Sequence, residues 1–257
     1  CGPVRRRARP HEPPAMIRYD PFSLRLSSPL GTAAGRIEER RWFVVRVESD
    51  GHRGVGEAAP LPGWTESHDD CEAALSGAAG GSSAADPTDP LDRIDVATPA
   101  ARHGVGLACA DARARAAGES VAAWLADGSP AASVPVNATV GDAPVEATAE
   151  ATREAVEAGY ETVKVKVGAR EPDADAARLR AVRDAADDGV ELRADANGAW
   201  DGPTAERMVD LAAELEFAYV EQPRPASDPA GNAAVRGRGV DIAADESVAA
   251  AGVDAIL

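Results

Sequence analysis

Lysine is almost missing from this 257-residue sequence. Only Lys164 and Lys166 are lysine among 27 Lys and Arg residues, so arginine fills every other such position. Arginine stays protonated, whereas a lysine amine can lose its proton and serve as a base. Two lysines so close together therefore indicate a chemical role. The alternative is a solvated strand face with two chance lysines, which the use of arginine elsewhere disfavours.

Cysteine and long apolar runs are also scarce. Cys1, Cys71 and Cys109 are widely spaced and form neither a metal-binding motif nor a disulfide framework, which is typical of a reducing cytosol. No apolar run reaches the length of a transmembrane helix, so we expect no membrane association. These shortages predict a cytoplasmic protein.

Positive charge is outnumbered by negative charge. The 43 Asp and Glu residues give a formal net charge of −16, and aromatic residues make up only 4%. Without a basic face to neutralise phosphates, nucleic acid is excluded as a partner. Many acids, arginine in place of lysine and few aromatics indicate a solvated, repulsive surface, which we interpret as halophilic adaptation. Ordinary acidic solubility is the alternative, and composition alone does not separate the two.

Residues 1–15 differ from the rest of the chain. They are rich in Arg and Pro and lack apolar periodicity. Arg5–Arg7 would suit an export signal, but no apolar segment follows. We expect residues 1–15 to be a disordered extension or the product of an upstream start site, with Met16 as the more natural start.

Residues 16–130 are expected to form an α+β domain. β-branched and alternating residues predict an antiparallel meander, with Asp50–Gly51 as the clearest turn. The expected strands are 17–27, 35–41 and 42–49. The expected helices are 67–79 and 98–126, the second broken near Gly118, with a polar loop at 80–90 between them.

Residues 131–257 alternate strand and helix patterns, which predicts an α/β fold with a parallel sheet. The expected strands are 134–140, 161–168, 190–198, 217–223 and 240–247, and the expected helices between them include 145–158, 173–186 and 204–214. Asn137 lies 27 residues before Lys164, so the period of the pattern extends to the first strand. A doubly wound open sheet would alternate in the same way, but acids at three successive strand ends favour a closed TIM-type (β/α) barrel.

The two lysines lie on the strand expected at 161–168. Residues i and i+2 of a strand point to the same face, so both ammonium groups share one side. Placing two like charges on an apolar strand is costly unless anions face them. The sequence therefore predicts acids opposite Lys164 and Lys166.

Three acids end the strands that follow. Asp195, Glu221 and Asp245 come 29, 26 and 24 residues after the preceding site residue, starting from Lys166. This is about the length of one strand–helix unit, and in a parallel barrel such strand ends meet at one rim. Three converging carboxylates need a cation, and hard oxygen ligands suit Mg²⁺. The alternative is that each acid separately caps a helix or turn.

These four motifs, in this order, resemble the enolase superfamily and its muconate-lactonizing-enzyme branch. The motifs are Lys164–Lys166, Asp195 in Arg-Ala-Asp-Ala-Asn, Glu221 in Val-Glu-Gln-Pro and Asp245 in Ala-Asp-Glu-Ser. The stretch Gly56–Trp64 is similar to the o-succinylbenzoate synthase family of menaquinone biosynthesis. The resemblance runs from about Met16 to the end of the sequence. It implies an enolase-like modified barrel in residues 131–257, with residues 16–130 as its capping domain.

The resemblance also implies roles for the site residues. Lys166 would be the base that removes a proton α to a carboxylate, and Lys164 would support the resulting anion. Asp195, Glu221 and Asp245 would bind Mg²⁺, with Mn²⁺ as an alternative ion, and the partner would be a small carboxylate substrate. Asn197 and Glu246 are further candidates, which would support the metal ligands. Arg193 would orient a lysine or the substrate. Trp64 would either contact substrate from a lid or serve only in packing.

For the o-succinylbenzoate synthase family the reaction is a dehydration, catalysed by a metal-dependent carbon–oxygen lyase. An N-acylamino-acid racemase, dipeptide epimerase or muconate-type cycloisomerase of the same superfamily is one alternative, and a non-catalytic metal-binding remnant is another. The family places a further lysine at the end of the sixth strand, which we expect beyond Leu257, so we expect residues 1–257 alone to be inactive. A homo-oligomer is compatible with the sequence.

Overall fold

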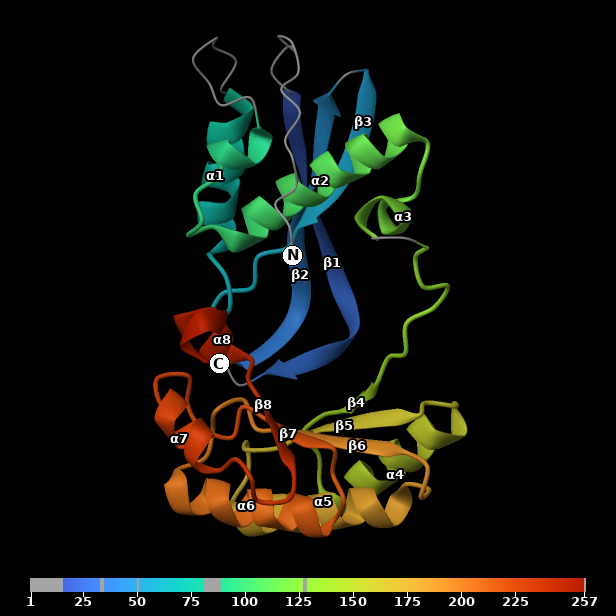
Figure 1. The fold of residues 1–257 in the computed structure, drawn as a ribbon, viewed down its shortest axis with the longest axis vertical. Coiled ribbons are helices and arrows are strands. Elements are labelled where there is room, and N and C mark those ends of the chain that lie inside the picture. The colour runs from blue at the N-terminus through green and yellow to red at the C-terminus, as the bar shows by residue number, and fades with distance from the viewer. Residues whose placement is uncertain (1–15, 33–34, 50, 81–88, 127–128, 257) are drawn as a thin grey trace. The chain divides into compact units, whose positions relative to one another are not determined.

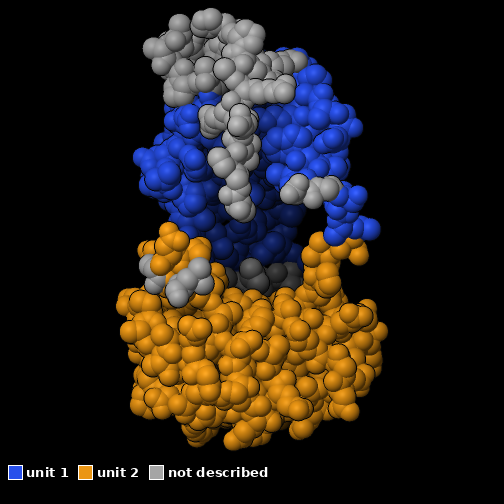
Figure 2. Space-filling model, viewed as in Figure 1, with its two compact units in different colours: residues 1–132 blue, residues 133–257 orange. Residues whose placement is uncertain are grey.

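The computed structural model describes residues 16–32, 35–49, 51–80, 89–126 and 129–256. The expectations for residues 1–15, for the turn residue Asp50 and for most of the loop at 80–90 lie outside the described residues. The chain divides into two compact units, residues 1–132 and 133–257, each with its own core (Figure 2). Among the described helices, none combines the length and apolar character that crossing a membrane requires.

The N-terminal unit is built on an antiparallel sheet in the order β1-β2-β3. The strands are β1 (Met16–Thr32), β2 (Gly35–Ser49) and β3 (His52–Ala58). Alternate residues of β2, namely Phe43, Val45 and Val47, are buried in the core of the unit. The predicted meander is confirmed, but its strand division was wrong. Residues 35–49 form one strand, since no turn residue separates Arg41 from Trp42, and the third strand is β3.

Helices pack on one face of this sheet (Figure 1). The helices on the sheet are α1 (His68–Gly80) and α2 (Pro99–Ala117), while the 3-10 turn η1 (Pro90–Arg93) and α3 (Val121–Leu125) contact α2. The predicted break at Gly118 is confirmed, because this residue ends α2 in the left-handed conformation with φ 74°. Such a φ is readily adopted only by glycine.

Small residues let α2 lie directly on β3. A Cβ added to Gly56 would come 2.1 Å from the carbonyl oxygen of Gly104, and one added to Gly54 would come 1.9 Å from that of Ala108. Neither approach is sterically possible. The alanine- and glycine-rich composition of α2 therefore allows a backbone-to-backbone contact that larger side chains would prevent.

The C-terminal unit contains a parallel sheet in the order β4-β5-β6-β7-β8. The strands are β4 (Ala138–Val140), β5 (Thr162–Lys166), β6 (Glu191–Asp195), β7 (Tyr219–Glu221) and β8 (Asp241–Ala243). Each strand is followed by a helix: α4 (Val145–Glu157), α5 (Pro172–Ala185), α6 (Gly202–Glu214), α7 (Pro229–Ala234) and α8 (Glu246–Ala251), after which comes the 3-10 turn η2 (Val253–Ala255).

Strand order and helix placement decide the fold class. The strands follow one another in chain order without reversal, and α4, α5 and α6 lie on one face of the sheet (Figure 1). A doubly wound sheet would reverse its strand order and carry helices on both faces. The α/β class with a (β/α)-barrel arrangement is therefore confirmed. Within the described residues the sheet has five strands, with β4 and β8 at its edges.

The apolar core of this unit lies between the sheet and its helices. Val163, Val165, Leu192, Ala194 and Val220 are fully buried there. The intervening residues of the same strands face the other side of the sheet, because side chains alternate.

The first strand is shorter than predicted. Val134 and Val136 are exposed, Pro135 between them has no N–H to donate, and the strand begins only at Ala138. In the observed register Thr139, and not Asn137, pairs with Lys164, so the equivalent position on the first strand lies two residues later than the predicted period indicates.

Candidate active site

Four charged side chains meet where β5, β6 and β7 end. Lys166 pairs in register with Asp195, and Asp195 pairs with Glu221. Lys164 lies one layer lower on the same face of β5. The strand period therefore places both lysines and two of the predicted acids on the face of the sheet opposite the apolar core.

The lysines and acids are in direct contact. Lys166 Nζ donates to Asp195 Oδ2 at 2.6 Å and to Asn197 Oδ1 at 3.0 Å. Lys164 Nζ donates to Asp195 Oδ2 at 3.0 Å and to Glu221 Oε2 at 3.3 Å. Asp195 is only 1% exposed, whereas the Lys166 side chain is 35% exposed. Asp195 is thus a buried anion between two ammonium groups, and Lys166 is the more accessible amine.

Burial and charge act on these groups in opposite directions. Burial would raise the pKa of Asp195, but the hydrogen bonds and charges of Lys166 and Lys164 outweigh it and lower that pKa. Burial would lower the pKa of Lys164, but Asp195 and Glu221 outweigh it and raise that pKa. The pKa of Glu221 is raised by burial and by the charges of Asp195 and Asp245, against the influence of Lys164. Glu221 therefore has less positive charge near it than its burial requires.

Asp245 and Glu246 complete the rim from β8. Asp245 follows β8 as the N-cap residue of α8, yet its side chain makes no capping hydrogen bond. Glu246 Oε1 accepts from Asn197 Nδ2 at 3.0 Å, while Glu246 Oε2 is buried without a partner. A chain of contacts therefore runs from Lys166 through Asn197 to Glu246.

Two further predicted site residues are Arg193 and Trp64. Arg193 pairs in register with Lys164, but its side chain donates to Glu191 Oε1 at 2.6 Å and stacks over the Tyr219 ring, 5.1 Å from the ring centroid. Trp64 belongs to the N-terminal unit, in a turn where its N–H donates to the Leu61 carbonyl, and is 38% exposed. Roles for Arg193 and Trp64 toward a substrate stay predictions.

The rim suits a divalent cation in donor type and in charge. Four carboxylates, of Asp195, Glu221, Asp245 and Glu246, stand against the two lysines, which leaves a net charge of −2. The orphaned, buried Glu246 Oε2 marks the same deficit of positive charge. Carboxylate oxygens are the ligands that Mg²⁺ prefers.

The lysines occupy part of the space that an ion would need. No three acid, histidine or cysteine side chains in the described part of the chain converge closely enough to hold an ion. Lys166 Nζ, hydrogen-bonded to Asp195 Oδ2 at 2.6 Å, stands at the oxygen that a cation would use. A cation at Asp195 would therefore require Lys166 to leave this oxygen.

Gln222 is a member of the rim that the sequence reasoning did not select. It is fully buried, has a positive φ of 42°, and its side-chain oxygen accepts from the Asp245 N–H at 3.0 Å. The only signal in the sequence was its position between Glu221 and Pro223 at a strand end. Its residue type alone did not show that this glutamine would be buried.

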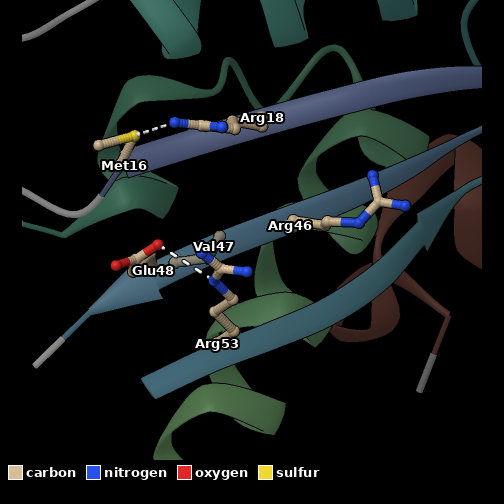
Figure 3. A pocket seen from close by; sticks show the side chains of 6 residues that line it. All are labelled: Met16, Arg18, Arg46, Val47, Glu48 and Arg53. Carbon is tan, nitrogen blue, oxygen red and sulfur yellow. Dashed lines mark hydrogen bonds and ion pairs between the residues drawn. The ribbon is translucent and has the colours of Figure 1, made fainter. Parts of the chain in front are cut away.

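A shallow hollow of about 90 Å³ lies on the N-terminal sheet (Figure 3). Its lining residues are Met16, Arg18, Arg46, Val47, Glu48 and Arg53. Arg46 pairs with Asp20, and Arg53 pairs with Glu48 at 3.2 Å, so two of its three guanidinium groups are neutralised. The hollow combines no nucleophile with a base and adds nothing to the chemistry of the rim.

The fold and the rim define a class of protein with an α+β unit and a (β/α)-barrel unit that carries amines and acids at its strand ends. The sequence matches "Mandelate racemase / muconate lactonizing enzyme, N-terminal domain" over residues 16–125 and "Enolase C-terminal domain-like" over residues 146–252. The chain belongs to the enolase superfamily, as its motifs predicted.

Relatives within this superfamily have different activities. The o-succinylbenzoate synthase of Thermobifida fusca is 48% identical over 118 residues, which are 45% of this chain and 36% of that protein. The o-succinylbenzoate synthase of Thermosynechococcus vestitus is 32% identical over 207 residues, 78% of this chain and 58% of that protein. The dipeptide epimerase of Enterococcus faecalis, solved with Mg and L-Leu-L-Tyr, has a TM-score of 0.82 at 27% identity and covers 90% of this chain and 67% of its own. The chain is thus shorter than the relatives it matches.

Proposed function

We propose that the rim of the C-terminal unit abstracts a proton α to the carboxylate of a small substrate, with Mg²⁺ as cofactor and Mn²⁺ as an alternative ion. The observation that carries this proposal is the placement of two lysines on one strand, both hydrogen-bonded to Asp195. Mg²⁺ in the E. faecalis epimerase structure supports the choice of ion. Asp195, Glu221 and Asp245 would hold it.

The chain's own residues account for the proton transfer. Lys166 is the more exposed amine, so it is placed to take the proton from the α-carbon. Lys164, whose raised pKa keeps it charged, offsets negative charge that develops on the substrate. Asn197 orients Lys166 through its Oδ1 and is itself held by Glu246. When bound, the metal would add positive charge at the substrate carboxylate.

Within this reaction class we propose o-succinylbenzoate synthase activity. The support is similarity to two such synthases and the stretch Gly56–Trp64. The step is a dehydration: the α-carbon loses its proton to Lys166, a carbon–carbon double bond forms, and the hydroxyl leaves as water after receiving a proton. The product would serve menaquinone biosynthesis.

Dipeptide epimerisation is the second candidate, favoured by the structural similarity to the E. faecalis epimerase. Racemisation of N-acylamino acids and muconate-type cycloisomerisation share the first proton transfer. A non-catalytic, metal-binding remnant is the alternative outside enzymes.

The deciding experiment offers the full-length protein each substrate with Mg²⁺. The substrates are the cyclohexadiene hydroxy-carboxylate, dipeptides, N-acylamino acids and a muconate, and Glu221→Gln is the matched inactive control. We expect dehydration to dominate and to disappear in Glu221→Gln. Faster exchange at the α-carbon of dipeptides would instead identify an epimerase, and no turnover of any substrate would favour the remnant.

The proposal extends to domains and surroundings. We propose a capping domain over residues 16–130, with Trp64 contacting substrate, and a barrel domain over 131–257. Trp64→Ala would then raise KM more than it lowers kcat.

A cytoplasmic, salt-rich setting is proposed from the free thiols of Cys71 and Cys109 and the acidic composition. We also propose that residues 1–257 alone are inactive, because the five-stranded sheet keeps β4 and β8 as edges.

A further inference from the structure

The Gln222 side chain uses all its hydrogen-bonding capacity inside the protein. Its Oε1 accepts from the N–H groups of Asp245 at 3.0 Å and Ser247 at 3.1 Å. Its Nε2 donates to the Arg224 carbonyl at 2.8 Å and to Ser247 Oγ at 2.6 Å. A carboxamide offers two acceptor and two donor positions, so every position is filled. Such a side chain is held in one orientation.

The backbone of Gln222 is equally constrained. Its N–H donates to the Ala243 carbonyl at 2.8 Å, and its carbonyl accepts from Gly198 at 2.7 Å. These bonds tie the end of β7 to β8 on one side and to the segment after β6 on the other. The positive φ of 42° is unusual for a residue with a side chain and persists only where the surroundings enforce it. Gln222 is therefore a fixed point at the rim.

Gln222 also contacts the start of α8, whose N-cap residue is Asp245. An aspartate at this position ordinarily accepts a hydrogen bond from an N–H of the first helical turn. Asp245 makes no such bond, and Gln222 Oε1 accepts from Ser247, the second residue of α8, in its place. Gln222, the residue after β7, thus performs the capping that Asp245 would otherwise perform.

As a consequence, the Asp245 carboxylate is exposed and does not cap α8. Asp195 and Glu221 are the last residues of β6 and β7, and Asp245 lies two residues beyond Ala243, which pairs in register with Glu221. Its charge is close enough to raise the pKa of Glu221. Without Gln222, Asp245 could turn back to cap its own helix and withdraw from the rim.

We propose that Gln222 is a positioning residue that caps α8 so that Asp245 remains available as a cation ligand. This inference rests on the proposed metal site and deepens it. Gln222 would not touch the ion; it would act through the backbone and the freed carboxylate of Asp245. Loss of its carbonyl oxygen should therefore weaken metal binding, while loss of its amide donors should matter less.

The test measures Mn²⁺ affinity of the full-length protein by electron paramagnetic resonance, with Mg²⁺ as competitor. Gln222→Met keeps an unbranched side chain of similar length and removes the four side-chain hydrogen bonds. We expect it to weaken Mn²⁺ binding by about 10- to 100-fold, as loss of a group that orients a ligand typically does. Gln222→Glu keeps a side-chain oxygen as acceptor, and its affinity should stay within about threefold of the unmodified protein or exceed it.

Two controls separate positioning from general damage. Thr152→Val removes a buried hydrogen bond to the Thr148 carbonyl in α4, away from the rim, and should leave Mn²⁺ affinity unchanged. Hydrogen exchange at the amides of Asp245 and Ser247, measured without metal, should be faster in Gln222→Met than in the unmodified protein. This second measurement shows whether the Gln222 side chain protects the N–H groups at the start of α8.

The outcomes are distinct. Absence of Mn²⁺ binding by the unmodified protein would overturn the proposed metal site and, with it, the role of Gln222. Binding that Glu221→Gln abolishes but Gln222→Met leaves unchanged would overturn only the role of Gln222. An equal loss in Gln222→Glu and Gln222→Met, or unchanged exchange at Asp245 and Ser247, would also refute the capping role.

Discussion

Arg178 Nη1 donates a hydrogen bond to Asp175 Oδ1 at 2.8 Å, and both side chains are wholly buried. Arg178 Nη2 also donates to the Gly141 carbonyl at 2.8 Å, and Asp175 Oδ2 accepts from the Gly168 N–H at 2.6 Å. The pair on α5 therefore holds the segments that follow β4 and β5. Gly168 is two residues from Lys166, so this pair supports the backbone that carries the proposed base.

Breaking this pair should be costly. Arg178→Met would leave Asp175 charged and buried without its partner, so we expect the free energy of unfolding to fall by about 3–5 kcal/mol. Urea denaturation measures the change. The matched control is Arg207→Met, which breaks the exposed Arg207–Asp173 pair and should cost less than about 1 kcal/mol. Equal losses in the two variants would contradict the importance of burial.

Lys166 should be irreplaceable by arginine. Lys166→Arg retains a positive charge at the rim but cannot lose its proton, so turnover should fall by at least about 100-fold. Steady-state kinetics on the proposed cyclohexadiene hydroxy-carboxylate substrate measure this. Mn²⁺ affinity is the control and should change less than turnover, because arginine keeps the positive charge that Lys166 places beside Asp195. Substantial activity in Lys166→Arg would remove Lys166 as the base.

The close contact between α2 and β3 predicts that two glycine-to-alanine substitutions will change stability in opposite directions. Gly56→Ala would place its Cβ 2.1 Å from the Gly104 carbonyl oxygen, and we expect a loss of at least about 2 kcal/mol in unfolding free energy. Gly77→Ala, inside α1 with no atom within 4 Å of the new Cβ, should instead gain about 0.5–1 kcal/mol. Thermal melting distinguishes the two. A tolerated Gly56→Ala would show that α2 can move away from β3.

Alkaline pH should destabilise the fold through its buried thiols. Burial raises the pKa of Cys71 to about 12, with Glu66 adding to the effect, and burial raises that of Cys109 to about 11. Unfolded thiols titrate near 9.0. Above pH 9 the unfolded chain loses protons that the folded chain keeps. Stability should therefore fall by roughly 1.4 kcal/mol per pH unit for each thiol, until the pH passes its folded pKa.

Melting temperatures from pH 8 to 10.5 test this dependence. Cys71→Ala should show a shallower alkaline decline than the unmodified protein, even if it is less stable at pH 8. Thiol reagents at pH 8 should react with Cys71 and Cys109 only after unfolding, because so little thiolate is present in the fold. Identical slopes for the variant and the unmodified protein would refute the linkage.

The elements with strong local patterns were predictable from the sequence. The β-branched run around Lys164 and Lys166 is strand β5, and the expected helix 145–158 is observed as Val145–Glu157. The lysine–acid contacts followed from two periods, that of a strand and that of a strand–helix unit. These features depend on spacing along one chain, which the sequence contains directly.

Other features depend on contacts between distant residues. Nothing in the local sequence shows that Gln222 would be buried and bonded to Asp245, 23 residues later. The stacking of Arg193 on Tyr219 likewise depends on the pairing of β6 with β7. β3 was missed as the third strand because its glycines are poor strand formers alone and are explained only by the approach of α2.

Both lysines lie at one rim, so reagents that modify amines would act at this site. Apart from the chain terminus, Lys164 and Lys166 carry the only aliphatic amines in the sequence. Among the side chains of residues 1–257, an acylating or reductive-alkylating reagent would therefore modify amines at a single location. Lys166, with 35% of its side chain exposed against 19% for Lys164, would be modified first. Immobilising the protein through Lys164 or Lys166 would tether it by the residues proposed to do its chemistry.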